Sequence, residues 1–68
     1  MLTARERDVL RLLSRGLRYA DIALSLGITR NTTAGHLKNA YRKLDVRSGP
    51  AAVMRAIEHR LLGENVTT

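Results

Sequence analysis

The chain has 68 residues and a hydrophobic fraction of 44%, which suffices for one small core but not for two. It contains no cysteine, which excludes disulfides and thiolate metal sites and fits a cytoplasmic protein. A formal net charge of +6 favours a polyanionic partner, either nucleic acid or an anionic membrane surface. The apolar runs are far shorter than the ~20 residues of a membrane span, and the basic residues are spread over several predicted helices. A membrane partner is therefore not expected.

The first predicted helix covers Thr3–Arg15. Thr3 and Glu6 have the T-x-x-E spacing of a capping box, in which each side chain bonds the backbone of the other residue. Apolar residues at i, i+3/i+4 spacing give the helix one inward face, and Gly16 follows as a left-handed stop. That face consists of Val9, Leu10 and Leu13.

The second predicted helix, Tyr19–Leu26, is short and ends at Gly27. Its start is poorly capped, because Arg18 stands where Ser, Thr, Asp or Asn is preferred. Asp21 partly compensates, since an acidic residue in the first turn interacts favourably with the helix dipole. The inward face consists of Ile22, Ala23 and Leu26.

The third predicted helix covers Thr29–Leu44, with Thr29 as its cap. One apolar stripe is expected to face inward, and polar, basic or small residues occupy the other faces. The inward stripe consists of Thr33, Leu37, Ala40, Tyr41 and Leu44. The other faces carry Arg30, Asn31, Ala34, Gly35, Lys38 and Arg42.

The fourth predicted helix covers Pro50–Leu62, with Ser48 or Gly49 as its cap and Gly63 as its stop. Its inward stripe consists of Ala52, Val53, Ala56 and Ile57. A second stripe consists of Ala51, Met54, Leu61 and Leu62, with Glu58 among them. We interpret this second stripe as a self-association surface. The alternative is that the last helix buries both stripes in its own domain.

A tight turn, Leu26-Gly27-Ile28-Thr29, joins the second and third predicted helices as in a helix-turn-helix. In that motif the second helix enters the major groove of DNA, while the first crosses the phosphate backbone. Side chains suited to phosphate contact surround the predicted recognition helix. They are Thr29, Arg30, Asn31, Thr32, Lys38, Arg42, Lys43 and Arg47. The alternative is the solvated face of an ordinary helical bundle, and the turn spacing favours DNA.

Catalysis has little support in the sequence. His36 and His59 are the two histidines, and the six acidic residues show no metal-ligand spacing. Packing or phosphate contact explains His36 better than ligation or general-base chemistry. No enzyme activity, catalytic residue, metal site or cofactor is predicted.

The motif L-T-x-R-E-R-x-V-L-x-L-L at Leu2–Leu13 resembles the opening of the LuxR-type DNA-binding domain (the NarL/FixJ/GerE superfamily). The similarity continues over nearly the whole chain without a gap. Its further positions are Gly16, Leu17, Ile22, Ala23, Leu26, Ile28, Thr32, His36, Leu37, Asn39, Lys43, Leu44, Val46, Ala52, Val53, Ala56, Leu61 and Leu62. The resemblance implies an all-α, compact four-helix domain without a wing, covering residues 1–63. After the helix stop at Gly63, residues 64–68 are expected to form a flexible tail.

The resemblance also implies a function. The chain would be the domain with which a bacterial transcriptional regulator binds double-stranded DNA, as a dimer through its fourth helix on a two-fold operator. RNA polymerase and an N-terminal sensor domain are further partners of such regulators. By position, Thr32, His36 and Lys43 match residues at or near the DNA backbone, Lys38 matches a reader of base edges, and Glu6 matches a glutamate that fixes the first helix.

Several residues depart from the family pattern. Thr33-Ala34 replaces Val-Lys, and Gly35 lies inside a helix, where glycine costs about 0.5–1 kcal/mol relative to alanine. Arg18, Ala40, Asp45 and Ser48-Gly49 also replace the usual residues. In one account the small residues allow close approach to the bases, and Ala34 contacts a thymine methyl while Asn31, Lys38 or Arg42 reads base edges. In the other, base reading is weakened, and the domain binds DNA without specificity or acts as a protein-interaction module.

Two sets of site residues follow. The predicted DNA-binding residues are Arg30, Asn31, Thr32, Ala34, Gly35, His36, Lys38, Arg42 and Lys43. The predicted dimer interface consists of Ala51, Met54, Glu58, Leu61 and Leu62.

Overall fold

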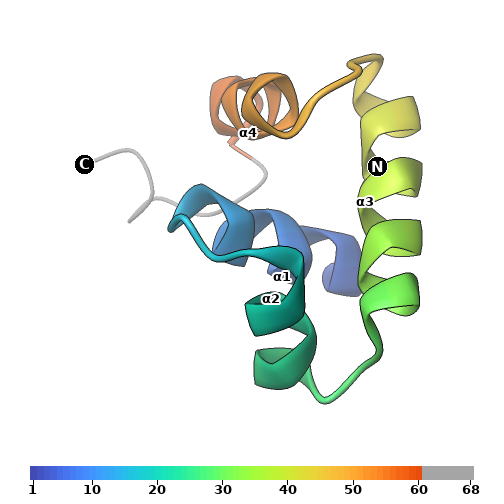
Figure 1. The fold of residues 1–68 in the computed structure, drawn as a ribbon. Coiled ribbons are helices and arrows are strands. Elements are labelled where there is room, and N and C mark those ends of the chain that lie inside the picture. The colour runs from blue at the N-terminus through green and yellow to red at the C-terminus, as the bar shows by residue number, and fades with distance from the viewer. Residues whose placement is uncertain (61–68) are drawn as a thin grey trace.

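The computed structural model describes residues 1–60, which form four α-helices and no strand (Figure 1). The helices are α1 (Ala4–Ser14), α2 (Tyr19–Leu26), α3 (Arg30–Leu44) and α4 (Gly49–Glu58). The expected all-α fold with four helices is confirmed. Over the same residues, no helix is long and apolar enough to cross a membrane.

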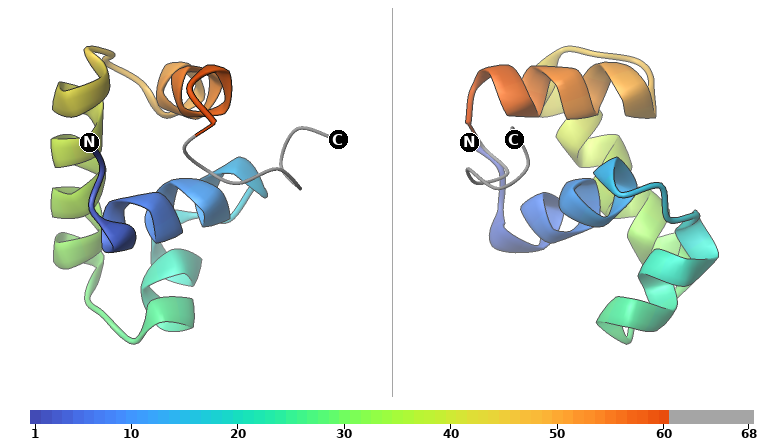
Figure 2. Two further views of the ribbon diagram at one scale, coloured as in Figure 1. Left: turned by 180° about the vertical axis from the view of Figure 1, so that it is seen from behind. Right: turned by 90° about the vertical axis from the view of Figure 1, so that its left-hand side faces the viewer.

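The longest helix, α3, forms one side of the domain and contacts each of the other three helices (Figures 1 and 2). Both α1 and α2 pack against it, and α4 lies across its C-terminal end and also contacts α1. The most deeply buried side chains come from all four helices. They are Val9, Leu10, Ile22, Thr33, Leu37, Ala40, Ala52 and Ala56.

The predicted helix starts agree with the observed hydrogen bonds. In the capping box of α1, the Thr3 N–H donates to Glu6 Oε1 at 3.0 Å, and the Glu6 N–H donates to Thr3 Oγ1 at 3.1 Å. At α2, the Arg18 N–H donates to an Asp21 carboxylate oxygen at 3.3 Å, so the acidic residue of the first turn bonds the backbone of the N-cap residue, while the Arg18 side chain caps nothing. At α3, Thr29 Oγ1 accepts the Thr32 N–H at 3.0 Å. Thr3 and Thr29 are therefore caps rather than first helical residues.

The fourth helix differs from its prediction at both ends. Ser48 is the cap, its Oγ accepts the Ala51 N–H at 3.2 Å, and the helix begins at Gly49 rather than Pro50. It ends at Glu58 rather than Leu62, because His59 is the C-terminal cap and Arg60 has a left-handed φ of 57° that interrupts the helical backbone. The apolar pattern of Leu61 and Leu62 predicted a longer helix. Those two residues, the predicted stop at Gly63 and the predicted tail 64–68 lie outside the described residues.

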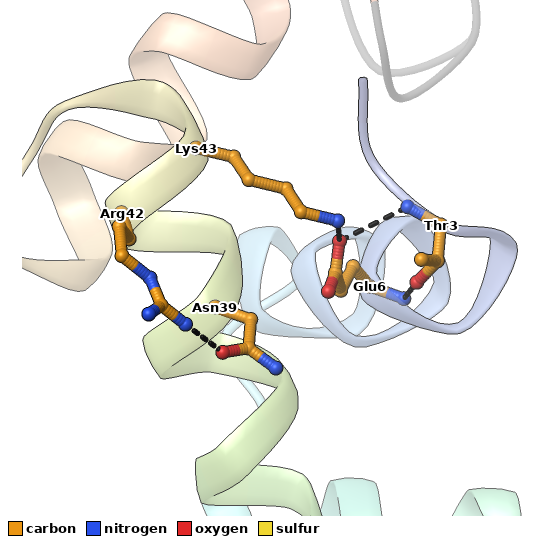
Figure 3. Close-up of polar contacts among 5 residues, drawn as sticks. All are labelled: Thr3, Glu6, Asn39, Arg42 and Lys43. Atoms are coloured by element: carbon orange, nitrogen blue, oxygen red, sulfur yellow. Dashed lines mark hydrogen bonds and ion pairs between the residues drawn. The ribbon is translucent and has the colours of Figure 1, made fainter.

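An ion pair links the first turn of α1 to the last turn of α3. The Glu6 side chain is buried, and its Oε1 accepts hydrogen bonds from Lys43 Nζ at 2.9 Å and from the Thr3 N–H (Figure 3). Burial alone raises the pKa of Glu6, but the Thr3 N–H and the Lys43 ammonium stabilise the carboxylate, and the net pKa lies below the ordinary value of 4.5. The resemblance assigned Glu6 a fixing role, and its contacts are of that kind.

The lowered pKa of Glu6 predicts a specific pH dependence of stability. Because the folded pKa lies below the unfolded one, the stabilisation is complete above pH 4.5 and is lost as the pH falls through the folded pKa. We expect Glu6→Gln to lower the free energy of unfolding by about 1–2 kcal/mol at neutral pH. The difference from wild type should shrink steadily in acid. Urea unfolding of both proteins across this pH range measures it, and a difference that does not change with pH would contradict the prediction.

Candidate nucleic-acid interface

Two threonines hold the first turn of α3 together, and one of them packs into the core. Thr33 is fully buried, and its hydroxyl donates to the Thr29 carbonyl at 3.0 Å, so the polar group is satisfied inside the core. The Thr29 side chain caps the same turn, and Gly27, with φ of 68°, turns the chain into it from α2. The Ile28 N–H also donates to the Ala23 carbonyl at 3.0 Å, which fixes the turn against α2. The orientation of α3 about its own axis is therefore set at its N-terminal end.

With Thr33 facing inward, the opposite side of α3 is a row of exposed residues. Asn31, Gly35, Lys38 and Arg42 follow one another at spacings of four, three and four residues, which places them on one face of a helix. We call these four residues the outward row. The structure thus brings together four of the nine predicted DNA-binding residues.

The other five predicted residues lie on the two sides of the outward row. Arg30 and Ala34 lie on one side, and Thr32, His36 and Lys43 lie on the other. Arg30, Thr32 and Lys43 are exposed, whereas Ala34 and His36 are half-buried. Thr32, His36 and Lys43, which the resemblance matches to residues at or near the DNA backbone, thus lie together on one side of the outward row.

The charge on α3 has one sign. The helix carries Arg30, Lys38, Arg42 and Lys43 and no acidic residue. Over residues 1–60, the ion pairs of basic residues with acidic partners include neither Arg30, Lys38 nor Arg42. These three cations therefore remain available to phosphate oxygens or base edges.

Two polar contacts orient basic side chains of α3 (Figure 3). The Arg42 guanidinium donates to Asn39 Oδ1, and this bond holds the guanidinium against its own helix. Lys43 bonds Glu6, so this predicted DNA contact also has an internal partner. Asn39 was absent from the predicted site residues, although its i, i+3 spacing to Arg42 signals such a pair.

The sequence model of one protein family, described as "Bacterial regulatory proteins, luxR family", matches residues 1–56. The chain belongs to the LuxR family. Transcription factor GerE, a solved structure, superposes with a TM-score of 0.80 at 33% identity, and the match covers 84% of this chain and 85% of GerE. This LuxR-family chain is therefore a DNA-binding domain of the kind found in transcriptional regulators, and the family is not one of enzymes.

Curated relatives are longer regulators. The chain is 50% identical over 52 residues to the probable transcriptional regulatory protein SgaR of Hyphomicrobium methylovorum, covering 76% of this chain and 25% of SgaR. It is 43% identical over 60 residues to the nitrate/nitrite response regulator protein NarP of Escherichia coli (strain K12), covering 88% of this chain and 28% of NarP. The LuxR-family chain thus spans only about a quarter of the length of these two relatives.

Three departures from the LuxR pattern preserve the geometry of the domain. Thr33, in place of valine, is buried with its hydroxyl bonded. Asp45, in place of glycine, adopts the left-handed conformation that favours glycine, with φ of 57°. Ser48, in place of asparagine, caps α4. These substitutions are therefore explained by the fold, whereas Ala34 and Gly35 contribute no comparable contact.

Lys43 is both a predicted DNA contact and the ion-pair partner of Glu6, so its substitution should destabilise the fold, whereas substitution of Lys38 should not. Lys43→Gln should lower the free energy of unfolding by about 1–3 kcal/mol, because it leaves the buried Glu6 carboxylate without its cation. Lys38→Gln, a matched change on the exposed row, should change it by less than about 0.5 kcal/mol. Urea unfolding at neutral pH measures both. Equal effects of the two substitutions would show that the Glu6–Lys43 pair contributes nothing to stability.

Proposed function

We propose that this LuxR-family domain recognises a specific double-stranded DNA sequence by placing α3 in the major groove, within a cytoplasmic bacterial transcriptional regulator. The outward row is the observation that carries the proposal. It presents an amide, an ammonium and a guanidinium on one exposed face of a helix that has no acidic residue. Such groups bind base edges and phosphates, and a helix of this width fits the major groove.

The residues divide into two roles. Asn31, Lys38 and Arg42 contact base edges, because they project from the centre of the exposed face. Ala34 and Gly35 let the helix approach the bases closely. The remaining four predicted residues contact the phosphate backbone and set the register of the helix. They are Arg30, Thr32, His36 and Lys43.

The decisive experiment is the selection of bound duplexes from a random pool. It yields the preferred sequence, its symmetry and its half-site spacing together. Affinity for the selected duplex and for a mixed-sequence duplex is then measured at two salt concentrations. A clear preference at both supports sequence-specific recognition. Equal affinity for both duplexes, with a steep salt dependence, would instead favour non-specific DNA binding or a protein-interaction role. That alternative arises because Ala34 has no hydrogen-bond donor where the family has lysine.

Substitution of Lys38 separates base reading from general electrostatics. Lys38→Ala should weaken binding to the selected duplex by roughly 5- to 100-fold, because a base contact worth about 1–3 kcal/mol is lost, and mixed-sequence binding should change much less. Arg15→Ala is the matched control. It also removes one exposed charge, but at the C-terminal cap of α1 rather than on α3. Equal losses on both duplexes would assign Lys38 to phosphate contact alone.

We further propose that the domain dimerises through α4 on a two-fold operator. Met54 is 60% exposed, which is unusual for a large apolar side chain. On the same helix, Glu58 is exposed and Ala51 is half-buried. Next to Met54 is an apolar concavity of about 390 Å³ between α1 and α4. Its lining residues are Leu13, Ser14, Gly49, Pro50, Val53 and Met54. This exposure does not favour the alternative in which α4 buries both of its stripes.

Further partners are proposed from the relatives. NarP and the response regulator protein VraR of Staphylococcus aureus are both named response regulators, and this chain covers 28% and 30% of their lengths. Their names support a sensor domain as a partner of this LuxR-family domain. RNA polymerase is a second proposed partner, because the relatives are named as regulators of transcription.

A charge placed on the exposed face of α4 tests the dimer. Met54→Lys should abolish self-association in analytical ultracentrifugation and weaken binding to a two-fold duplex more than binding to a single half-site. Leu24→Lys adds the same charge at an exposed leucine on α2 and should leave the oligomeric state unchanged. A Met54→Lys protein that associates like the wild type, on DNA and in solution, would remove α4 as the interface.

A further inference from the structure

Gly35 has no role in the folded domain that requires glycine. It lies inside α3, and the positive-φ glycines among the described residues are Gly16 and Gly27. A Cβ added at Gly35 would meet nothing within 4 Å, whereas at Gly49 it would lie 3.2 Å from Leu13 Cδ2. Glycine inside a helix is less favourable than alanine. The fold therefore accounts for the other described glycines but not for Gly35.

The position of Gly35 places a gap in the middle of the outward row. Asn31 lies one turn before it and Lys38 one turn after it, and both are exposed. The gap is therefore bordered along the helix by an amide and an ammonium, and its floor is backbone. The half-buried methyl of Ala34 lies beside it. A partner surface can approach the backbone of α3 more closely here than at the neighbouring positions.

The groups that line the gap determine whether a polar or an apolar part of a base can fill it. The Gly35 N–H takes part in the hydrogen-bonded backbone of α3, so the floor offers no free donor. A polar base edge pressed against it would lose water without gaining a hydrogen bond, which is unfavourable. A methyl group forms no hydrogen bonds with water, so it loses none when it is buried in the same place. In the major groove, the base that presents a methyl group is thymine.

We infer that the gap at Gly35 is a specificity pocket for the 5-methyl group of a thymine, lined by the Gly35 backbone and the Ala34 methyl. The inference rests on the proposed function, since it requires α3 in the major groove. It assigns one A·T base pair of the recognised site to Gly35, between the bases contacted by Asn31 and Lys38.

The test begins with the selected duplex, in which each thymine is replaced in turn by uracil, which lacks the methyl group. At one thymine the wild-type domain should lose affinity by about fourfold, equivalent to one buried methyl group. Gly35→Ala fills the gap, so it should bind the thymine duplex roughly tenfold more weakly than wild type does. The same variant should prefer uracil to thymine at that position, because its own methyl then occupies the vacated space.

Stability and a second added methyl group provide the controls. Gly35→Ala should raise the midpoint of thermal unfolding by about 2–6 °C, so weaker binding cannot be attributed to misfolding. Ser25→Thr also adds one methyl group at an exposed helical position, but on α2 and away from the outward row, and it should keep the wild-type preference for thymine. A duplex with 5-methylcytosine in place of that thymine should bind wild type about fourfold more tightly than one with cytosine, since only the methyl differs.

Two results would overturn the inference. In the first, the Gly35→Ala variant binds the selected duplex as tightly as wild type does. In the second, every uracil substitution changes the affinity of wild type and of the Gly35→Ala variant equally. A pool that yields no preferred sequence would instead contradict the proposed function.

Discussion

The buried carboxylate of Glu6 is the constraint on which the arrangement of α1 and α3 depends. It completes the capping box of α1 and binds Lys43 in the last turn of α3. A carboxylate excluded from water must keep such partners, because breaking a buried pair is strongly destabilising. The ammonium therefore fixes the C-terminal half of α3, as Thr29 and Thr33 fix its N-terminal turn. The face that α3 shows to solvent is determined at both ends. A contact between Lys43 and phosphate would have to share the ammonium with Glu6.

Local signals in the sequence were sufficient to predict most of the fold. The caps at Thr3 and Thr29 depend on residues within one turn, and their hydrogen bonds agree with the prediction. The end of α4 was predicted wrongly, because apolar periodicity persists beyond the residue at which the backbone leaves the helix. The Glu6–Lys43 pair joins residues 37 positions apart. No spacing rule predicts such a contact, and only the family resemblance indicated that Glu6 has a fixing role.

The departures from the LuxR pattern fall into two physical classes. At Thr33 and Asp45 the unusual residue makes a bond or adopts a backbone conformation that the fold requires. At Ala34 and Gly35 the side chain is short or absent beside the exposed face of α3, and a Cβ added at Gly35 would meet nothing within 4 Å. The first class preserves the scaffold, and the second changes only what an external partner meets. Sequence comparison detects both classes equally, and only burial and contacts separate them.

The difference between Thr33 and Gly35 corresponds to the two faces of α3. Its inward stripe of Thr33, Leu37, Ala40 and Leu44 contributes to the core, while the outward row makes no contribution to it. Substitutions on the row therefore change an exposed face of α3 and have little effect on the packing of the core. The core itself is packed almost as densely as a crystal and tolerates little change. A glycine on this row weakens the helix slightly but leaves the core intact. The exposed residues of α3 can therefore be replaced one at a time without loss of the fold. Glu6, Thr33 and Lys43 keep the helix in position while its exposed face changes.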